Sequence, residues 1–402
     1  MRFLDASRGT RGTVVASAAL LVAAGTTSAF ATPSTPSTTS SSASVWKVST
    51  VAPADAVTIG STRPDAKTTW AAGMRFIRKG NGDFTFSPTL WERDENKGPG
   101  WKRVRTAPVP DTYDVRFNDV DASSARNAVA GGDYVDQLHG VLTQHWNGSA
   151  WKTAVAPVPR GTIGAGFLSV DTRAPGDAWG AGWAQVPVTT NESRDVGLLG
   201  HWDGTRWKAQ KLPDFGAGKD GWTLESVTAL AADNVWAVGG TFDANGAKPL
   251  LLHYDGRKWA KVSVPVSGTR TVLHGIAAGP HGTLWAVGET RTAGGTARGL
   301  ALSFDGRKWT NVALPSGTHA LQSVAVSRGA AVVLDRGSRT AGPNVLRRKG
   351  SGWTAMKLPT KNGKALQTID ISASGRTIDV AGTYPGRNGT DFASVVLTAQ
   401  AG

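Results

Sequence analysis

Short apolar runs recur along most of the chain, and clusters of Gly, Asp, Asn and Pro separate them. Residues 250–254 (LLLHY) and 259–262 (WAKV) are one such pair, divided by the four residues Asp-Gly-Arg-Lys. Runs of this length, rich in β-branched and aromatic residues and bounded by turn formers, are typical of β-strands. The pattern therefore predicts many short strands joined by tight turns.

One motif repeats, consisting of an aromatic residue, Asp-Gly or Asn-Gly, two variable residues and Trp. Full copies occupy residues 146–151, 202–207, 254–259 and 304–309, and degenerate copies end at Trp101 and Trp353. The tryptophans at 101, 151, 207, 259, 309 and 353 are 50, 56, 52, 50 and 44 residues apart. Asp-Gly and Asn-Gly between apolar runs predict the tip of a β-hairpin, with a type I′ turn at each copy.

A second hairpin precedes this motif in each repeat. In the best copy, residues 224–228 and 235–239 (VWAVG) flank a turn at Asp233-Asn234. Two hairpins per repeat make four antiparallel strands in up-and-down order, which is the composition of a propeller blade.

The two ends of the chain complete this count. The last repeat, from Leu366, supplies three strands, and residues 45–49 (VWKVS) match the outer-strand pattern without a preceding hairpin. An N-terminal strand that supplied the missing fourth would leave the ring without an open edge. We therefore expect an all-β, seven-bladed β-propeller of four-stranded antiparallel blades, closed by the N-terminal strand.

The repeat resembles kelch-like propellers in its Gly-Gly doublet, its third-strand aromatic and its Trp five residues later. Gly131-Gly132 with Trp146 and Trp151, and Gly239-Gly240 with Tyr254 and Trp259, carry this resemblance. The chain also resembles uncharacterised secreted propeller proteins of actinobacteria. These resemblances imply a fold and an extracellular location, and they supply no catalytic residues.

The N-terminus has the features of an export signal. Arg2, Arg8 and Arg11 precede an apolar run at residues 14–24 and a small-x-small site ending at Ala31. This order predicts a signal peptide at residues 1–31 and a secreted protein with no membrane span. Residues 32–44, rich in Ser, Thr and Pro, read as a flexible leader, and residues 45–402 as a single propeller domain. We expect a monomer.

Composition restricts the chemistry of this domain. The absence of cysteine excludes disulfides, thiolate metal sites and a Cys-Tyr cofactor. His145, His201 and His253 share one repeat position, which would set them apart around the ring, so no metal site and no cofactor are expected. With 44 Lys and Arg against 30 Asp and Glu, the protein should attract polyanions.

The innermost strands should line a central channel at the hub. Their second positions include Asn118, Glu225, His274, Gln322 and Gln367, which predicts a polar channel mouth. Glu225 and Asp119, with His274 nearby, are the hub candidates for catalysis. A pair of carboxyl groups there would suit a secreted carbohydrate-active hydrolase or lyase. The other interpretation is a water-lined channel.

Loops should divide between the two faces of the ring. The turns between third and fourth strands place five cations on one face, and the longer connections lie on the other. The first group is a basic rim, namely Arg206, Arg257, Lys258, Arg307 and Lys308. The second group, favoured for binding because variable loops on a rigid scaffold carry function, includes Trp183, Arg194, Phe242 and Tyr384.

These patterns favour a secreted, non-enzymatic binding or interaction module. Its expected partners are a glycan, an anionic or neutral cell-wall polymer, or another protein. The hub enzyme is the alternative, and the arrangement of carboxyl groups at the hub distinguishes the two interpretations.

Overall fold

A computed structural model describes most of the predicted domain. The described residues are 45–80, 84–98, 100–109, 114–135, 140–213, 215, 221–266, 270–292, 294–337, 342–385 and 392–401. The signal peptide and leader predicted at residues 1–44 lie outside them. The described chain contains 28 strands, one short 3-10 turn at Pro280–Gly282 and no α-helix. No helix in these ranges is long and apolar enough to cross a membrane.

The strands fall into consecutive groups of four, numbered here as units in chain order. Unit 1 comprises β2 (Ala56–Thr62), β3 (Thr68–Arg78), β4 (Phe84–Asp94) and β5 (Lys102–Arg103). Unit 2 comprises β6 (Asp114–Ser124), β7 (Asn127–Val135), β8 (Val141–Trp146) and β9 (Trp151–Ala156). Unit 3 comprises β10 (Gly164–Ala174), β11 (Asp177–Pro187), β12 (Ser193–Trp202) and β13 (Trp207–Ala209). Unit 4 comprises β14 (Trp222–Ala231), β15 (Asn234–Asp243), β16 (Gly246–Tyr254) and β17 (Trp259–Lys261).

The remaining units follow the same plan. Unit 5 comprises β18 (Thr271–Ala278), β19 (Leu284–Arg291), β20 (Ala297–Phe304) and β21 (Trp309–Asn311). Unit 6 comprises β22 (Leu321–Ser327), β23 (Ala330–Asp335), β24 (Asn344–Lys349) and β25 (Gly352–Lys357). Unit 7 comprises β26 (Gln367–Ser374), β27 (Thr377–Pro385), β28 (Phe392–Gln400) and the N-terminal β1 (Lys47–Thr50).

Within each unit, neighbouring strands pair antiparallel in chain order. Units 2 and 3 are also joined, through the single pair Gly166↔Asp133. The strand expected at residues 45–49 is found at Lys47–Thr50, where it pairs with β28 from Lys47↔Thr398 to Thr50↔Val395. The first strand of the chain therefore completes the last sheet.

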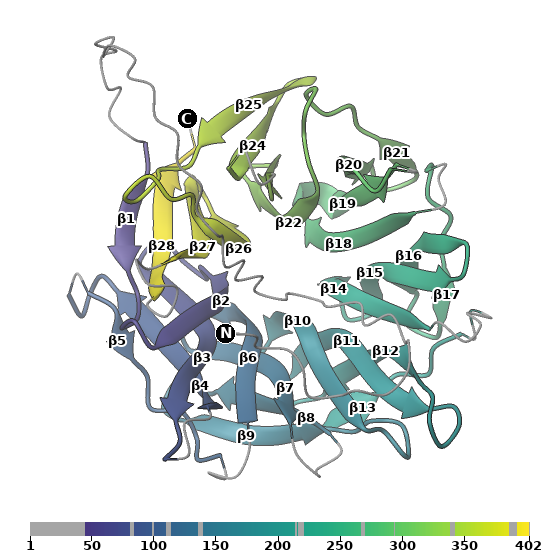
Figure 1. The fold of residues 1–402 in the computed structure, drawn as a ribbon, viewed down its shortest axis with the longest axis horizontal. Coiled ribbons are helices and arrows are strands. Elements are labelled where there is room, and N and C mark those ends of the chain that lie inside the picture. Colours follow the sequence, from purple (N-terminus) through teal and green to yellow (C-terminus); the bar gives the residue numbers. More distant parts are fainter. Residues whose placement is uncertain are drawn as a thin grey trace, which may run out of the picture.

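The first strand of each unit lies nearest the centre, from β2 to β26 (Figure 1). These innermost strands contact one another in chain order, and β26 also contacts β2. Because strands alternate in direction, the turns after the first and third strands share one face of the ring, here called the turn face. The connections after the second and fourth strands share the opposite connection face.

The predicted type I′ turns are wrong. Trp202 pairs with Trp207 across a four-residue loop, and only the glycine of that loop, Gly204, has a positive φ, at 93°. The carboxylate of Asp203 instead accepts hydrogen bonds from the backbone N–H groups of Thr205 and Arg206, each at 2.9 Å. An Asp side chain that closes the loop in this way removes the need for a second positive φ.

Tryptophans of the repeat pack one unit against the next. Trp236 on β15 stacks on His253 of its own unit, with ring centroids 4.1 Å apart. The same ring meets Phe304 and Trp309 of unit 5 at 5.1 and 5.7 Å. Trp179 makes the equivalent contacts with His201, Tyr254 and Trp259 one unit earlier. The spacing of the repeat thus places an aromatic cluster between consecutive units.

The junction between units 7 and 1 is built differently. Arg63 donates from Nε to Asp379 Oδ2 in an ion pair whose side chains are 1% and 0% exposed. Ser394 Oγ donates to Ala56 O at 2.7 Å and accepts from Thr58 N–H at 3.1 Å. These contacts link residues more than 300 positions apart in the chain.

Truncation at the N-terminus tests the role of β1. Deleting residues 32–44 should leave the melting temperature unchanged. Extending the deletion through Ser49 removes Trp46, which is 5% exposed, together with most of the β1–β28 pairing. Loss of a buried tryptophan alone costs about 3–5 kcal/mol, so the melting temperature should fall sharply. Equal melting temperatures for the two truncations would show that β1 is dispensable.

The loop glycines provide a second test. Gly306 has φ of 92°, and an added Cβ would meet no atom within 4 Å, so Gly306→Val isolates the backbone effect. A left-handed conformation costs a non-glycine residue about 1–2 kcal/mol, and thermal unfolding should register that loss. Gly100→Val is the matched control, because that position has equal space and no positive φ. Identical melting of both variants would contradict the assigned backbone strain.

Candidate functional site

Each innermost strand contains one β-bulge near its connection-face end. In unit 4, Leu224 pairs with Gly239 and Ser226 with Val238, so Glu225 is the extra residue. Gly239 is required opposite the bulge, because a Cβ there would lie 2.0 Å from Thr223 O. Bulges redirect side chains and are enriched beside functional sites. The equivalent extra residues are Ile59, Asn118, Leu168, His274, Gln322 and Ile369.

Polar residues occupy the bulge in three consecutive units. Glu225, His274 and Gln322 lie on the neighbouring strands β14, β18 and β22, and all three are half-buried. Three charged residues of units 5 and 6 act electrostatically on His274, namely Glu289, Arg291 and Arg336. The structure therefore brings three sequence-predicted residues into one sector, here called the hub-mouth cluster. Its members are Glu225, His274, Glu289, Arg291, Gln322 and Arg336.

The charges of this cluster surround His274 with both signs. Burial is the main cause that lowers the pKa of His274, and the guanidinium groups of Arg336 and Arg291 act in the same direction. The carboxylates of Glu225 and Glu289 oppose them. His274 is therefore held neutral near pH 7, with one ring nitrogen able to accept and one able to donate.

Hydrogen-bond acceptors in the cluster are incompletely used. Glu289 is 6% exposed, and its Oε1 accepts from Arg291 Nε at 2.6 Å. Its Oε2 and the Oε1 of Gln322 are buried and have no hydrogen-bond partner within the described ranges. Arg291 and Arg336 are exposed on the connection face. The cluster thus combines buried acceptors that lack a hydrogen-bond partner with exposed donors.

Asn118 and Asp119, predicted for binding and catalysis, have structural roles. Asn118 Nδ2 donates to Asp133 Oδ1 at 3.0 Å and to Phe167 O at 2.9 Å. Asp119 accepts from the backbone N–H of Val120 at 2.8 Å and from that of Val170 at 2.9 Å. Each carboxylate oxygen of Asp119 therefore already accepts one hydrogen bond from the backbone of the ring.

Asp119 belongs to a series of side chains that link neighbouring innermost strands. Asp370 Oδ2 accepts from Ser61 N–H at 3.0 Å, and Ser226 Oγ accepts from Ile276 N–H at 3.4 Å. In each case the residue after the bulge accepts from the backbone of the following unit. The sequence did not reveal Asp370, because the strand of unit 7 was aligned two residues too early. Asp121 and Asp171 were not among the hub candidates, because they lie two positions further along their strands than the residues considered.

The pKa values of these buried carboxyl groups are raised. Burial raises the pKa of Asp171 to about 8, and the negative charge of Asp121 adds to the effect. Burial also raises the pKa of Asp370 to about 6 and that of Asp119 well above its usual range. The carboxyl groups of the hub are thus hydrogen-bonding elements of the ring.

Gln367 was assigned to the wrong strand position. Thr368 pairs with Gly382 as Leu273 pairs with Gly288, so Ile369 is the bulged residue of unit 7. The alignment began the strand at Leu366, two residues early, because that leucine resembles the first residue of other repeats. Gln367 is half-buried on β26, opposite Thr383.

The residues predicted on the connection face are distributed over three units. Trp183 and Arg194 belong to unit 3, Phe242 to unit 4 and Tyr384 to unit 7. Arg194 is exposed, whereas Trp183 and Phe242 are half-buried. Tyr384 is 3% exposed and its hydroxyl donates to Pro359 O at 2.8 Å, so it is a core residue.

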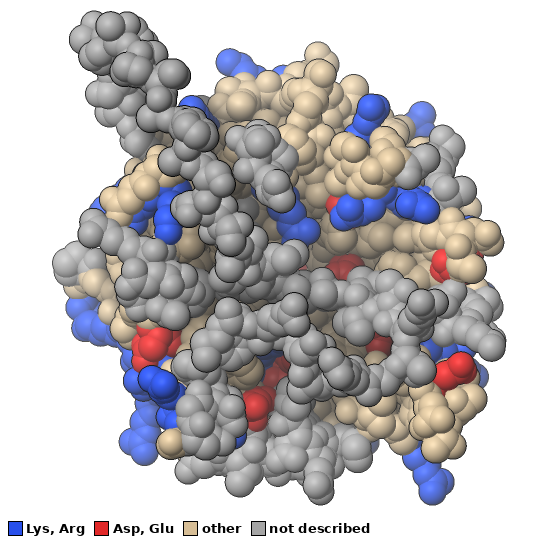
Figure 2. All heavy atoms as spheres, viewed as in Figure 1, with Lys and Arg blue, Asp and Glu red and all other residues tan. Residues whose placement is uncertain are grey.

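The basic rim residues share one environment. Arg206, Arg257–Lys258 and Arg307–Lys308 are all exposed on the equivalent turns of units 3, 4 and 5. On the face seen in Figure 2, Lys and Arg atoms lie mostly around the outer edge, and several Asp and Glu atoms lie nearer the centre.

Within the described residues, no group of three or more His, Asp and Glu is arranged to hold a metal ion.

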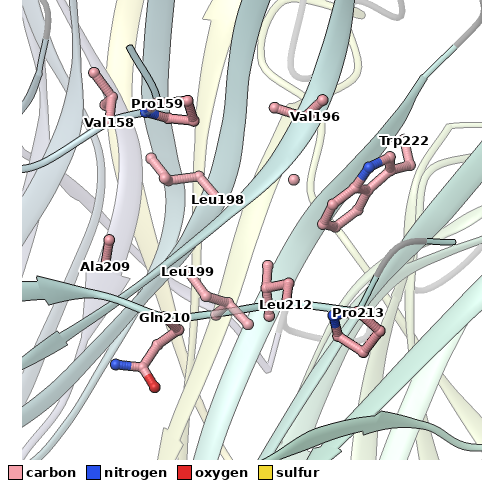
Figure 3. A pocket seen from close by; sticks show the side chains of 11 residues that line it. Val158, Pro159, Val196, Leu198, Leu199, Ala209, Gln210, Leu212, Pro213 and Trp222 are labelled. Carbon is pink, nitrogen blue, oxygen red and sulfur yellow. The ribbon is translucent and has the colours of Figure 1, made fainter.

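Two grooves lie between units, away from the hub. The first, of about 370 Å³, is lined by Leu198, Leu199, Leu212 and Trp222, with Gln210 at its edge (Figure 3). Trp222 covers Gly197 closely, since a Cβ there would lie 2.0 Å from its ring. The second, of about 570 Å³, lies between units 4 and 5 and includes Arg307 and Lys308 of the basic rim.

Comparison with known proteins gives the architecture. No family model and no curated protein matches the chain. Among solved structures, 362 chains match, including a structure of YCF48 bound to D1 peptide. That likeness has a TM-score of 0.51 at 15% identity and covers 89% of this chain and 97% of the other. It shows a β-propeller architecture for this protein.

The pH dependence of stability tests the raised pKa of Asp171. A carboxyl group with a pKa of about 8 in the folded state and about 4 when unfolded contributes stability that is lost as pH rises from 4 to 8. Asp171→Asn should remove that loss, so its melting temperature should rise relative to the parent across this range. Asp203→Asn should show no pH-dependent difference from the parent over most of this range, because hydrogen bonds lower the pKa of Asp203 and its carboxyl group stays ionised there. A constant difference between parent and Asp171→Asn would contradict the assignment.

Proposed function

We propose that the protein is an exported, seven-bladed propeller closed by β1. The contacts from β2 round to β26 and back to β2, together with the β1–β28 pairing, support the closed ring. The basic and apolar order of residues 1–31 supports export. The glycine opposite the bulge in six of the seven units, as at Gly132 and Gly239, supports a kelch-like repeat.

We propose further that the protein is a non-enzymatic binding module for a protein partner, with a peptide segment bound at the hub mouth. The observation that carries this proposal is the hub-mouth cluster. A peptide backbone offers alternating N–H donors and C=O acceptors. The N–H groups of a peptide would match the acceptors without a partner at Glu289 and Gln322. Its C=O groups would match the exposed donors of Arg291 and Arg336. The propeller neighbour YCF48, bound to D1 peptide, is a precedent for this class of ligand.

The hub hydrolase or lyase is less well supported. That mechanism needs two carboxyl groups facing a substrate. Asp119 has both oxygens engaged by backbone N–H groups, and Asp370 accepts from Ser61 N–H and Ser323 Oγ. Asp119 and Asp370 are thus engaged within the ring, which favours the binding module over the enzyme.

A second candidate partner is an anionic polymer on the basic rim. Five cations at equivalent turns of three consecutive units support it, because their exposed charges repeat in one direction around the ring. Binding of this kind weakens with salt, since exposed charges are screened over about 8–10 Å at physiological ionic strength.

Peptide display tests the first candidate. Linear peptides selected on the parent protein should bind the double variant Glu225→Gln/Arg336→Gln at least about tenfold more weakly, because buried interface groups carry most binding energy. The control is Arg257→Gln/Arg307→Gln on the turn face, which should bind as the parent does. Calorimetry measures both affinities. Failure to select any peptide, or equal binding by the hub variant, would refute a peptide site at the hub mouth.

A further inference from the structure

The groove between units 4 and 5 joins apolar walls to cations. Val262–Pro265 follow β17 and form one wall, and Phe304 and Trp309 of unit 5 form another. Arg307 and Lys308, both exposed, complete the lining. The nearby Asp305 carboxylate accepts from the backbone N–H groups of Arg307 and Lys308, each at 2.9 Å, which holds it within the loop.

Trp309 presents an unused donor in this groove. Its side chain is more than nine-tenths buried, and its Nε1 has no hydrogen-bond partner within the described part of the chain. A buried indole N–H normally finds an acceptor. An acceptor supplied by a ligand would satisfy it.

The neighbouring unit shows how this donor is satisfied elsewhere in the repeat. Trp259 is the equivalent of Trp309, and its Nε1 donates to Gln210 Oε1 at 3.4 Å. Gln210 stands three residues after Trp207 in the outer segment of unit 3. The residue three after Trp259 is Val262, which lines the groove and has no polar side chain. Two other tryptophans at this repeat position also have no partner for Nε1 within the described residues, namely Trp101 and Trp151. The acceptor at Gln210 is therefore not general to the repeat, and the groove at Trp309 adds two cations to the unused donor.

We propose that this groove binds one carboxylate-bearing sugar residue of an acidic polysaccharide. A hydroxyl oxygen of the sugar accepts from Trp309 Nε1, in the place that Gln210 takes one unit earlier. The carboxylate pairs with Arg307 and Lys308, and the apolar face of the sugar ring packs between Pro265 on one wall and Phe304 on the other. This inference rests on the second candidate partner proposed above, an anionic polymer on the basic rim, and names one contact between that polymer and the protein.

The repetition of the rim favours a polysaccharide over an acidic peptide. A uronic acid residue carries hydroxyl groups and a carboxylate on one rigid ring, which matches a neutral donor beside two cations. Neighbouring sugar residues along the polymer carry the same charge. The equivalent turns of units 3 and 4 present the exposed cations Arg206, Arg257 and Lys258. Contacts that are weak singly then add through multivalency.

Filling the groove from within tests the proposal. Val262→Gln supplies the missing acceptor for Trp309 and occupies the groove without changing charge. It should keep or raise the melting temperature and weaken binding of oligogalacturonate at least about tenfold. Val312→Gln, the same change three residues after Trp309, is the matched control and should bind as the parent does. The double variant Arg307→Gln/Lys308→Gln, on an exposed turn, should bind weakly and with a reduced salt dependence.

The outcomes separate the groove from the rim as a whole. Parent-like binding by Val262→Gln, with loss only in the double variant, would overturn the groove and leave a purely electrostatic rim. Equal affinity for polyglutamate of the same charge would overturn the sugar assignment. Absence of binding to every anionic polymer would refute the second candidate partner itself, whereas peptide binding at the hub would be unaffected. A shift of the Trp309 indole NMR signal on adding oligogalacturonate, absent in Val262→Gln, would support the contact directly.

Discussion

Aromatic packing between consecutive units is the interaction on which the rest of this structure depends. A four-stranded sheet has two apolar faces and cannot bury both alone, so each unit requires a neighbour. Trp70, Trp179 and Trp236 meet this need by contacting the aromatic rings of the following unit. In unit 2 the equivalent residue is Val129, and His145 stacks on Trp202 of unit 3 instead, at 3.9 Å. Filling the interface matters more than the identity of the ring.

This packing explains the histidines of the repeat. His145, His201 and His253 each lie against a tryptophan in a separate cluster. Burial lowers the pKa of His145 to about 4, so its ring is neutral at physiological pH and serves as an aromatic surface. A residue type often associated with metal binding or catalysis is here a packing element.

The contacts between units also determine where function can reside. Side chains after the bulge connect neighbouring innermost strands in five units, and the ion pair of Arg63 with Asp379 lies buried at the junction of units 7 and 1. Replacing these residues would weaken the ring, so variation without structural cost is concentrated at the hub mouth, the loops and the grooves. The hub-mouth cluster spans three consecutive units, and the groove at Trp309 places two cations beside an unused indole donor.

The sequence by itself determined the local structure, because strands and turns follow from nearby residues. The repeat of Asp-Gly and Trp located the hairpins, and the pattern at residues 45–49 located the strand that pairs with β28. It also placed Glu225, His274 and Gln322 correctly at one repeat position. Only the tertiary structure decided what these positions do. Whether a carboxyl group such as Asp119 is free or bonded depends on backbone N–H groups some 50 residues away. Whether Trp309 lacks an acceptor depends on Val262 in the preceding unit, and such contacts between units are set by packing, which no local pattern encodes.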